Sequence, residues 1–432
     1  MSRKYAWLVS VNKALLVLLA PAFVVVSASR ARAQSDESTD RITIVHAGTL
    51  LPVPGQPPQE RQSVVIINDR IDRVVSGYAT ADSLDFDDAE VIDLRDHFVL
   101  PGLMDMHVHF TNGRLPNTVP DEAADVYRMT IGIVNARKTL RAGYTTVRNP
   151  GARGWSIFAL RDGINNGDLE GPRMFVAGHT IRIGTERGSG SCFSVETCRE
   201  AVRRQIRMGA DFIKVYATCS GGQPCSHQDA PAVFMKDELE AVVQTAKTRE
   251  LKVAAHAHPT AGINLALEAG VDSIEHGSWL DETSYELLTH SNSYLVPTLM
   301  VRDLVQKRLD NDELTPERRA RMERSQKEHP RRVAEGFKKG VMIASGSDAG
   351  VVPHGENARE LEWYVDIGLT EMEAIETATV NAAKLLGEEE SLGTIEAGKS
   401  ADLIAVSGNP LEDISELTDV DFVMKAGTVF VR

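Results

Sequence analysis

The 432-residue sequence predicts an α/β protein: a (β/α)8 TIM barrel with a small composite β-sandwich built from both chain ends. Eight short apolar runs alternate with helical stretches between about Pro101 and Gly387, and eight such units imply a closed parallel barrel. Outside that region, strand-like alternation of apolar and polar residues occurs at both ends of the chain. The same strand–helix alternation also allows a doubly wound open sheet, which is the alternative fold.

The first 33 residues predict a secretory signal peptide that is not part of the fold. Basic residues up to Lys13 precede an apolar run, Ala14–Val26, and Ala31-Arg32-Ala33 then offers a small-residue cleavage site. Cleavage after Ala33 would leave a periplasmic or secreted protein that begins at Gln34, without stable membrane insertion. The apolar run is short for a membrane-spanning helix, and an uncleaved membrane anchor is the alternative.

The charge of the chain argues against two classes of partner. Five of the 47 basic residues and none of the 61 acidic residues lie in residues 1–33, so the mature chain would carry a net charge of −19, compared with −14 for the full sequence. Such an acidic surface argues against nucleic acids and anionic membranes as partners. It does not discriminate among small-molecule substrates.

The β-sandwich is divided between residues 34–100 and residues 391–432. Each part contains three strand-like segments separated by turn residues. These segments are Ile42–Val45, Ser63–Ile67, Val91–Leu94, Ala401–Val406, Phe422–Lys425 and Val429–Val431. Because neither part is a complete module, we expect the two to pair with each other.

The barrel is predicted over residues 101–390, and its first strand is expected to begin slightly earlier. The eight predicted strands are Phe98–Phe110, Tyr144–Asn149, Met174–Ile181, Phe212–Thr218, Lys252–His258, Ser273–Gly277, Tyr294–Met300 and Val341–Asp348. The helical stretches between them include Asp125–Ala142, Thr197–Met208, Lys236–Glu250 and Pro316–Lys339. Thr370 and Glu373 form a capping box for a last helix that runs to about Gly387.

Histidines and an aspartate stand where predicted barrel strands end. His107 and His109 are two residues apart on the first strand, so their side chains point the same way. His256, His276 and Asp348 end the fifth, sixth and eighth strands. The ends of the strands meet at one face of such a barrel. Four imidazoles and a carboxylate there predict a divalent-metal site, best matched to Zn²⁺, with Mn²⁺ or Co²⁺ as alternatives.

Lys214 ends the apolar run Phe212-Ile213-Lys214-Val215, where a charged ammonium beside metal ions is unfavourable. A buried lysine can lose its proton, and the neutral amine reacts with carbon dioxide. The resulting carbamate has two oxygens that can bridge two metal ions. A lysine that extends its ammonium into solvent is the alternative interpretation.

Several residues near the same strand ends are candidates for contact with a substrate. Tyr216, two residues after Lys214, should face the same way and either bind a substrate carboxylate or fill the barrel. His179 ends the third run, His227 follows the fourth, and His258 lies on the same face as His256. His354 and Arg148 are further candidates, whereas His46, His97, His290 and His329 are expected to be surface or capping residues.

The four cysteines fall in two pairs of equal spacing: Cys192 with Cys198, and Cys219 with Cys225. In an oxidising compartment these pairs predict local disulfides, and free thiols are the alternative. The spacing matches no zinc-finger pattern, so thiolate metal ligation is not expected.

Four segments show a resemblance to a known family. Pro101–His109 resembles the opening signature of the amidohydrolase superfamily, and Gly393–Leu403 resembles its return into the β-sandwich. Ala255–His258 followed by Ser273–Gly277 resembles the imidazolonepropionase-like branch. That branch includes prolidase-like dipeptidases, carboxypeptidases and ochratoxin-hydrolysing amidases. Its members are often homo-oligomers, which we expect of this chain by analogy.

The resemblance implies a binuclear metal centre. Its ligands would be His107, His109 and Asp348 for the more buried ion, His256 and His276 for the second ion, and carboxylated Lys214 as the bridge. His258 competes with His256 for the ligand role, and we prefer His256 because related sequences often carry another residue at the place of His258. In that case His258 contacts substrate or supports the ligands.

The sequence departs from many relatives at two places. Gly184–Gly190 replaces a Gly-Gly-His-type segment after the third strand, and Asn149 follows Arg148 where an acidic residue is common. We therefore expect the pocket to accept an unusual C-terminal group.

The implied chemistry is hydrolysis. Two cations that share a water would lower its pKa enough to give hydroxide near neutral pH, which attacks a carbonyl polarised by one metal. Asp348 would act as the catalytic acid–base group that takes the proton and delivers it to the leaving nitrogen. No G-x-S-x-G segment for a serine nucleophile is present.

The predicted function is an exported binuclear metal-dependent amidohydrolase. Its small-molecule substrate would contain an amide or peptide bond next to a free carboxylate, as in a dipeptide, a C-terminal residue or an N-acyl amino acid such as ochratoxin A. One alternative is a ring-opening hydrolase or deaminase with a single metal, and another is a non-enzymatic metal- or solute-binding protein. Two metals per chain would argue against the first, and chelator-sensitive hydrolysis against the second.

Overall fold

Two sheets arranged edge to edge form a closed β-barrel in the computed structural model of the chain, which describes residues 40–184, 190–219, 227–311 and 313–432. The predicted signal peptide and most of the segment between Gly184 and Gly190 lie outside these residues. None of the described helices is both long enough and apolar enough to cross a membrane.

The barrel contains eight parallel strands. They are β5 (Leu103–Asp105), β6 (Tyr144–Asn149), β7 (Arg173–Val176), β10 (Ile213–Tyr216), β11 (Val253–Ala257), β12 (Ser273–His276), β13 (Tyr294–Val296) and β14 (Met342–Ile343). Sheet β5-β6-β7 is joined to sheet β10–β14 at both edges, by parallel bridges between Ile181 and Val215 and between Val108 and Ala349. The predicted barrel is therefore confirmed, and the open doubly wound sheet is wrong.

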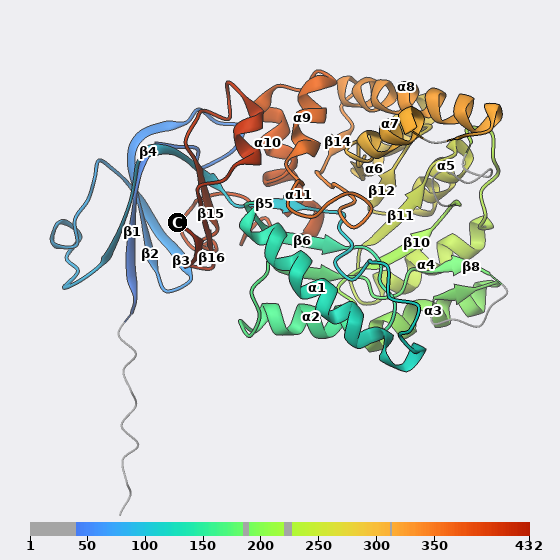
Figure 1. Cartoon of the computed structure of the whole chain (residues 1–432), viewed down its shortest axis with the longest axis horizontal. Helices are drawn as coiled ribbons and strands as arrows, with labels where there is room; N and C mark the ends of the chain where they lie inside the picture. Colours follow the sequence, from blue (N-terminus) through green and yellow to red (C-terminus); the bar gives the residue numbers. More distant parts are fainter. Residues whose placement is uncertain (1–39, 185–189, 220–226, 312) are drawn as a thin grey trace, which may run out of the picture. The chain divides into compact units, whose positions relative to one another are not determined.

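Helices follow the barrel strands and cover the barrel (Figure 1). They are α1 (Ala124–Arg141), α2 (Ser156–Asn165), α3 (Val195–Met208), α4 (Lys236–Lys247), α5 (Thr260–Ala269), α6 (Glu282–Ser291), α7 (Val301–Asn311), α8 (Pro316–Lys338), α9 (Arg359–Asp366), α10 (Glu371–Thr377) and α11 (Val380–Leu386). Short elements are β8 (Arg182–Ile183), β9 (Ser191–Cys192) and the 3₁₀ turns η1 (Asp82–Leu84), η2 (Asp121–Ala123) and η4 (Ile414–Thr418).

Two details of the helices differ from expectation. The capping box at Thr370 is present, but the single last helix is divided into α10 and α11, because the backbone at Thr379 is not helical (φ −132°, ψ −95°). In addition, α7 follows β13 and packs beside α8, where only the second of these helices was predicted (Figure 1).

Strands from both chain ends form a single seven-stranded sheet. They are β1 (Ile42–Leu50), β2 (Gln59–Ile67), β3 (Arg70–Ser76), β4 (Glu90–Pro101), β15 (Leu403–Val406), β16 (Phe422–Lys425) and β17 (Thr428–Val431). Their order is β17-β16-β15-β4-β1-β2-β3, and β4 joins the two parts by pairing parallel with β1 and antiparallel with β15. The expected pairing of the chain ends, blue and red in Figure 1, is thus present.

The first barrel strand was predicted too early. Residues 98–101 of the run Phe98–Phe110 belong to β4, and the barrel begins with β5 after Gly102. A side chain at Gly102 would collide with Thr145, because an added Cβ atom would lie 2.3 Å from its Oγ1 atom. Glycine therefore allows the chain to pass directly from the seven-stranded sheet into the barrel and to deliver His107 and His109 just beyond β5.

Alternate side chains of β15 pack in two different cores. Leu403 and Ala405 belong to the apolar cluster of the seven-stranded sheet, whereas Ile404 and Val406 belong to the large cluster that fills the barrel side. This period of two is the pattern of a strand buried on both faces. The sheet therefore packs on the barrel through one face and carries its own core on the other.

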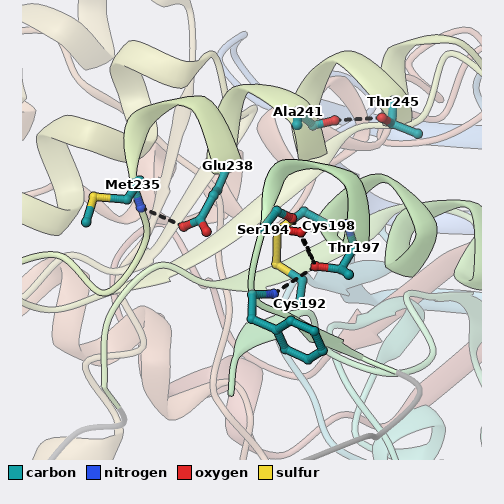
Figure 2. The surroundings of a disulfide bond; sticks show 9 residues. Cys192, Ser194, Thr197, Cys198, Met235, Glu238, Ala241 and Thr245 are labelled. Carbon is teal, nitrogen blue, oxygen red and sulfur yellow. Dashed lines mark hydrogen bonds between the residues drawn. A yellow bond between two sulfur atoms is a disulfide. The ribbon is translucent and has the colours of Figure 1, made fainter. Parts of the chain in front are cut away.

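A disulfide between Cys192 and Cys198 joins β9 to α3 (Figure 2). Next to it, the Ser194 hydroxyl accepts a hydrogen bond from the Thr197 backbone N–H and caps the helix. The prediction of a local disulfide is confirmed for this pair. The other predicted pairing involves Cys225, which lies outside the described residues.

Candidate metal centre

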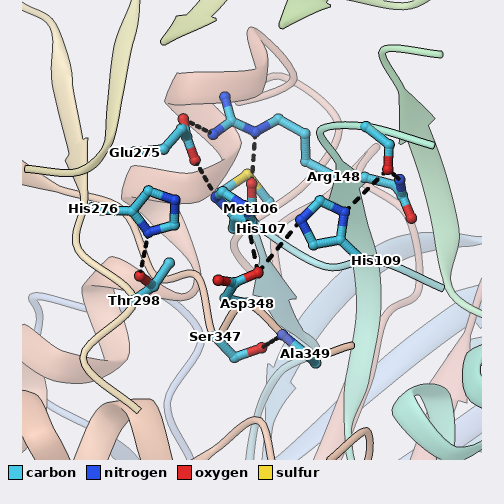
Figure 3. A network of polar contacts seen from close by, with 12 residues as sticks. Met106, His107, His109, Arg148, Glu275, His276, Thr298, Ser347, Asp348 and Ala349 are labelled. Atoms are coloured by element: carbon cyan, nitrogen blue, oxygen red, sulfur yellow. Dashed lines mark hydrogen bonds and ion pairs between the residues drawn. The ribbon is translucent and has the colours of Figure 1, made fainter. Parts of the chain in front are cut away.

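His107, His109 and Asp348 form the first group of metal-binding side chains. One nitrogen or oxygen of each lies within 4.8 Å of the others. The Asp348 Oδ1 atom is 3.4 Å from His109 Nε2 and 3.7 Å from His107 Nε2 (Figure 3). The backbone N–H of Asp348 donates to the His107 carbonyl, so pairing of the segments after β5 and β14 creates this group.

His256, His258 and His276 form the second group, again with ligand atoms within 4.8 Å of one another. His256 lies in β11, His258 just after it, and His276 ends β12. The rings of His107 and His276 are 5.0 Å apart between centroids, so the two groups adjoin. Both His256 and His258 belong to this group, and the geometry does not select one of them.

Lys214 lies beside both groups. Its side chain is buried, with 1% of the residue exposed, and its ammonium has no hydrogen-bond partner among the described residues. Burial lowers the pKa of Lys214 to about 8. The ammonium in turn lowers the pKa of each of the five histidines, His107, His109, His256, His258 and His276. One buried amine is therefore within electrostatic range of every imidazole of both groups.

Unusual backbone conformations direct two of these side chains. His276 has φ +72° and Asp348 has φ +57°, in the left-handed region that residues with a Cβ atom seldom adopt. In β12, regular alternation would turn His276 away from the face that Glu275 occupies. The left-handed backbone instead brings the His276 ring to the metal centre, where Thr298 Oγ1 lies 2.7 Å from its Nδ1 atom.

Glu275 is a buried carboxylate that the sequence analysis missed. Its Oε2 atom is 2.6 Å from His107 Nδ1, and its Oε1 atom accepts a hydrogen bond from Arg148 Nη2 at 2.6 Å (Figure 3). Ser273 Oγ donates to the same Oε1 atom, also at 2.6 Å. Burial raises the pKa of Glu275, but Arg148, Lys214 and His107 lower it more strongly, so the group is ionised. It fixes the His107 ring so that the opposite nitrogen, Nε2, faces Asp348.

Arg148 was a candidate for substrate contact, but the structure gives it a supporting role. Its guanidinium is buried inside the barrel and donates to Glu275, to Ser273 and to the Met106 carbonyl. Arg148 is therefore a positioning residue for the metal centre.

Asp105 is a second buried carboxylate behind the metal centre. It accepts hydrogen bonds from the backbone N–H groups of His107 and Ser347 and from the side chains of Ser347 and Asn357. It thereby connects the segment of His107 to the segment of Asp348. The sequence signal for this role is its place at the end of β5, two residues before His107.

We expect Glu275→Gln to weaken metal binding by about 10–100-fold, since outer residues that orient metal-binding histidines typically contribute that much. The metal-free variant should also lose about 3–5 kcal/mol of stability, because Arg148 then remains buried without a charged partner. Metal dissociation constants from chelator competition and unfolding curves measure both effects. Glu268→Gln, which alters an exposed glutamate paired with Lys236, is the matched control. Wild-type metal affinity in Glu275→Gln would contradict the assigned role.

A cavity of about 540 Å³ opens over both groups. Tyr216 and His258 line it, together with the metal-binding residues and Lys214. His179 and His227 are not among its lining residues: His179 Nε2 lies 3.2 Å from the Gly154 carbonyl oxygen, and His227 is exposed. Of the four substrate-binding candidates, the structure thus brings two to the cavity.

His329 was expected at the surface or at a helix end, and this expectation is wrong. It is buried within α8, with 2% of the residue exposed, and its Nε2 atom is 2.7 Å from the His276 carbonyl oxygen. It therefore supports the strained segment of His276. His354, a further candidate, packs against Phe110 and Thr139 and does not line the cavity.

The structure thus brings two groups of possible metal ligands together at one end of a closed parallel barrel. The chain belongs to the amidohydrolase family, whose model matches residues 98–430. This confirms the resemblance found in the sequence.

Relatives agree with this assignment. Ochratoxinase from Aspergillus niger is 31% identical over 441 residues, covering 92% of this chain and 88% of the relative. An imidazolonepropionase from Fusobacterium nucleatum is 26% identical over 179 residues, covering 40% of this chain and 38% of the relative. The chain is therefore a hydrolase that acts on amide bonds, and the non-enzymatic alternative is wrong.

Solved structures agree as well. A Xaa-Pro dipeptidase with bound methionine has a TM-score of 0.82 and 37% identity, covering 90% of this chain and all of that chain. A prolidase in complex with N-methylphosphonate-L-proline has a TM-score of 0.80 and 28% identity, with the same coverage. These structures share the fold described above over nearly its whole length.

Proposed function

We propose that the protein is an exported binuclear amidohydrolase that cleaves an amide or peptide bond next to a free carboxylate. Substrates of this class are dipeptides, C-terminal residues of short peptides and N-acyl amino acids. The observation that carries the proposal is the buried amine of Lys214, which has no hydrogen-bond partner in the described part of the chain and lies beside two adjoining groups of possible metal ligands. As a carbamate, Lys214 would supply the oxygens that let one residue serve both groups.

The residues present fit two divalent cations. Burial lowers the pKa of His107 to about 3 and of His109 to about 4, so these rings are neutral, as metal ligands must be. The Asp348 Oδ1 atom is buried without a hydrogen-bond partner among the described residues. Imidazoles with a carboxylate and a carbamate suit Zn²⁺. We propose His107, His109 and Asp348 for one ion, His256 and His276 for the other, and carboxylated Lys214 between them.

Two divalent cations bound here would lower the pKa of a shared water and polarise the carbonyl of the scissile amide. Asp348 lies beside His107 and His109 in the floor of the cavity, where its carboxylate takes the proton of the attacking water and returns it to the leaving nitrogen. Thr298 and Glu275 hold the His276 and His107 rings in place during the reaction. Tyr216 lines the same cavity and is the proposed contact for the substrate carboxylate.

The relatives support an amide next to a carboxylate. The molecules bound in the two solved structures, methionine and a derivative of L-proline, are an amino acid and an amino-acid derivative. Export is supported by the signal-peptide pattern of residues 1–33 and agrees with the Cys192–Cys198 disulfide. A periplasmic or secreted homo-oligomer remains our expectation for the mature chain.

The test uses the mature chain, residues 34–432, purified with zinc and bicarbonate. We expect two zinc ions per chain and hydrolysis of some dipeptides or N-acyl amino acids, which a chelator abolishes and added zinc restores. One metal per chain with turnover of imidazolones or of an exocyclic amine, and none of the amides, would instead establish the single-metal ring-opening or deaminating alternative.

A further inference from the structure

The cavity over the metal centre is lined by arginines. Six arginines are among its described lining residues: Arg153, Arg182, Arg302, Arg308, Arg318 and Arg321. Among the described lining residues, Asp348 is the one carboxylate, and it belongs to the metal centre. The whole chain has a net charge of −14, so this positive surface is the opposite of what its composition would give by chance. Clefts lined by one sign of charge concentrate ligands of the other sign.

Arg302 is the most informative of these arginines. It is buried, with 8% of the residue exposed, and lines the cavity close enough to lower the pKa of His258. Its Nη1 atom donates to Ser325 Oγ at 3.0 Å, but its Nε atom has no hydrogen-bond partner in the described part of the chain. A buried guanidinium without a carboxylate partner is unfavourable unless a ligand supplies the negative charge.

Glu360, the carboxylate that acts electrostatically on Arg302, already accepts other hydrogen bonds. Glu360 raises the pKa of Arg302 from nearby, yet its two oxygens accept hydrogen bonds from the backbone N–H groups of Leu299 and Met300, at 2.7 and 2.6 Å. Burial outweighs this effect and lowers the pKa of Arg302 to about 10, which still leaves the group charged at neutral pH. The guanidinium therefore stays available to an anion in the cavity.

The helix pair α7–α8 adds further positive charge at the cavity. Arg308 of α7 and Arg318 of α8 are exposed, line the cavity and form no ion pair with a described carboxylate. By contrast Arg331, also on α8 but outside the cavity, pairs with Glu328 and Glu335. On α8, the charge of Arg331 is therefore balanced by neighbouring carboxylates, whereas Arg318 at the cavity forms no ion pair with a described carboxylate. Arg182, which belongs to β8, also lines the cavity, and its Cζ atom lies over the ring of Tyr216, 5.6 Å from the ring centroid.

We propose that the substrate carries a second negative charge besides the carboxylate next to the scissile amide. The substrate class is dipeptides that end in aspartate or glutamate, and N-acyl derivatives of these amino acids. One carboxylate would lie near Tyr216 and Arg182, and the other would reach Arg302 and its neighbours on α7 and α8. A guanidinium can donate two parallel hydrogen bonds to one planar carboxylate, which a lysine ammonium cannot do. This difference explains why the proposed binding residues are arginines. This inference rests on the proposed amide hydrolysis.

The test compares substrates of equal size with and without the second charge. We expect the zinc-loaded mature chain to show at least about tenfold higher kcat/KM for Ala-Glu than for Ala-Gln, and for N-acetylglutamate than for N-acetylglutamine. The ratio should fall as salt is raised, because screening weakens the attraction. Calorimetry gives a second readout: the product L-glutamate should bind more tightly than L-glutamine.

Three variants assign the effect to the cavity. Arg302→Met should bring the Glu/Gln ratio close to one. Arg318→Gln, at an exposed position that folding does not need, should lower the ratio by about two- to fivefold and reduce its salt dependence. Arg331→Gln removes the same charge from the same helix outside the cavity and should leave the ratio unchanged.

The outcomes separate the two proposals. Equal hydrolysis of the charged and neutral substrates, or a preference that survives both Arg302→Met and Arg318→Gln, overturns the charge inference and leaves amide hydrolysis standing. If the zinc-loaded protein cleaves no amide of either kind, both proposals fail together.

Discussion

Asp348→Asn is expected to lower kcat by about 10³-fold or more for any amide substrate, because the variant loses a proton carrier and a negatively charged metal ligand in one change. The fold should survive. Asparagine has the same shape as aspartate, and burial raises the pKa of Asp348 to about 7, so a folded protein without metal resists ionising this group. Steady-state kinetics with the best substrate of the panel measures the loss.

The stability of the metal-free Asp348→Asn variant provides its control. The folded-state pKa of Asp348 lies above that of an unfolded chain, so its burial destabilises the wild type increasingly as the pH rises toward 7. The asparagine variant should therefore melt at the same temperature as the wild type near pH 4 and at an equal or higher one at pH 8. A variant that retains more than a tenth of wild-type kcat would remove Asp348 from the catalytic step.

Lys214→Met is expected to abolish binding of at least one of the two metals and to reduce kcat/KM by about 100-fold or more, since no carbamate can form on methionine. Methionine fills nearly the same volume as lysine without its charge. Because burial disfavours the ammonium, the metal-free variant should be as stable as the wild type or more stable. Metal content by mass spectrometry and thermal unfolding measure the two effects.

The carbamate itself has a direct signature. Wild-type protein loaded with zinc in ¹³C-bicarbonate should give a carbamate carbon resonance that Lys214→Met lacks. Lys247→Met, which changes an exposed lysine at the end of α4, is the control and should keep both the resonance and two metals. Full activity and two metals in Lys214→Met would mean that another group joins the ions.

The barrel and the positions of its metal-binding residues could be predicted from sequence because they follow from short-range patterns. Apolar runs of strand length ending in His107, His256 and Asp348 place polar groups at the same end of parallel strands, and closure of the barrel brings them together. The disulfide between Cys192 and Cys198 could be predicted for a similar reason, because the two cysteines are only six positions apart in the sequence.

The parts that sequence did not reveal depend on contacts between distant segments. Glu275 is separated from His107 by 168 residues, and a single acid in a strand has no local signal beyond facing the same way as Ser273. The sequence analysis did not name α7, whose buried residues are Arg302 and Leu309. The left-handed backbone of His276 likewise appears only when the neighbouring strands are in place.

The position of β4 in the seven-stranded sheet has a consequence for biogenesis. One edge of β4 is covered by β15, so the N-terminal strands cannot complete their hydrogen bonding until the ribosome has released almost the entire polypeptide. Nascent chains would expose this unpaired, apolar edge throughout synthesis, a state that invites aggregation. A truncation that removes β15 would leave that edge of β4 open, so a sheet that begins at the N-terminal end of the chain is completed only by the segment from Leu403 onward.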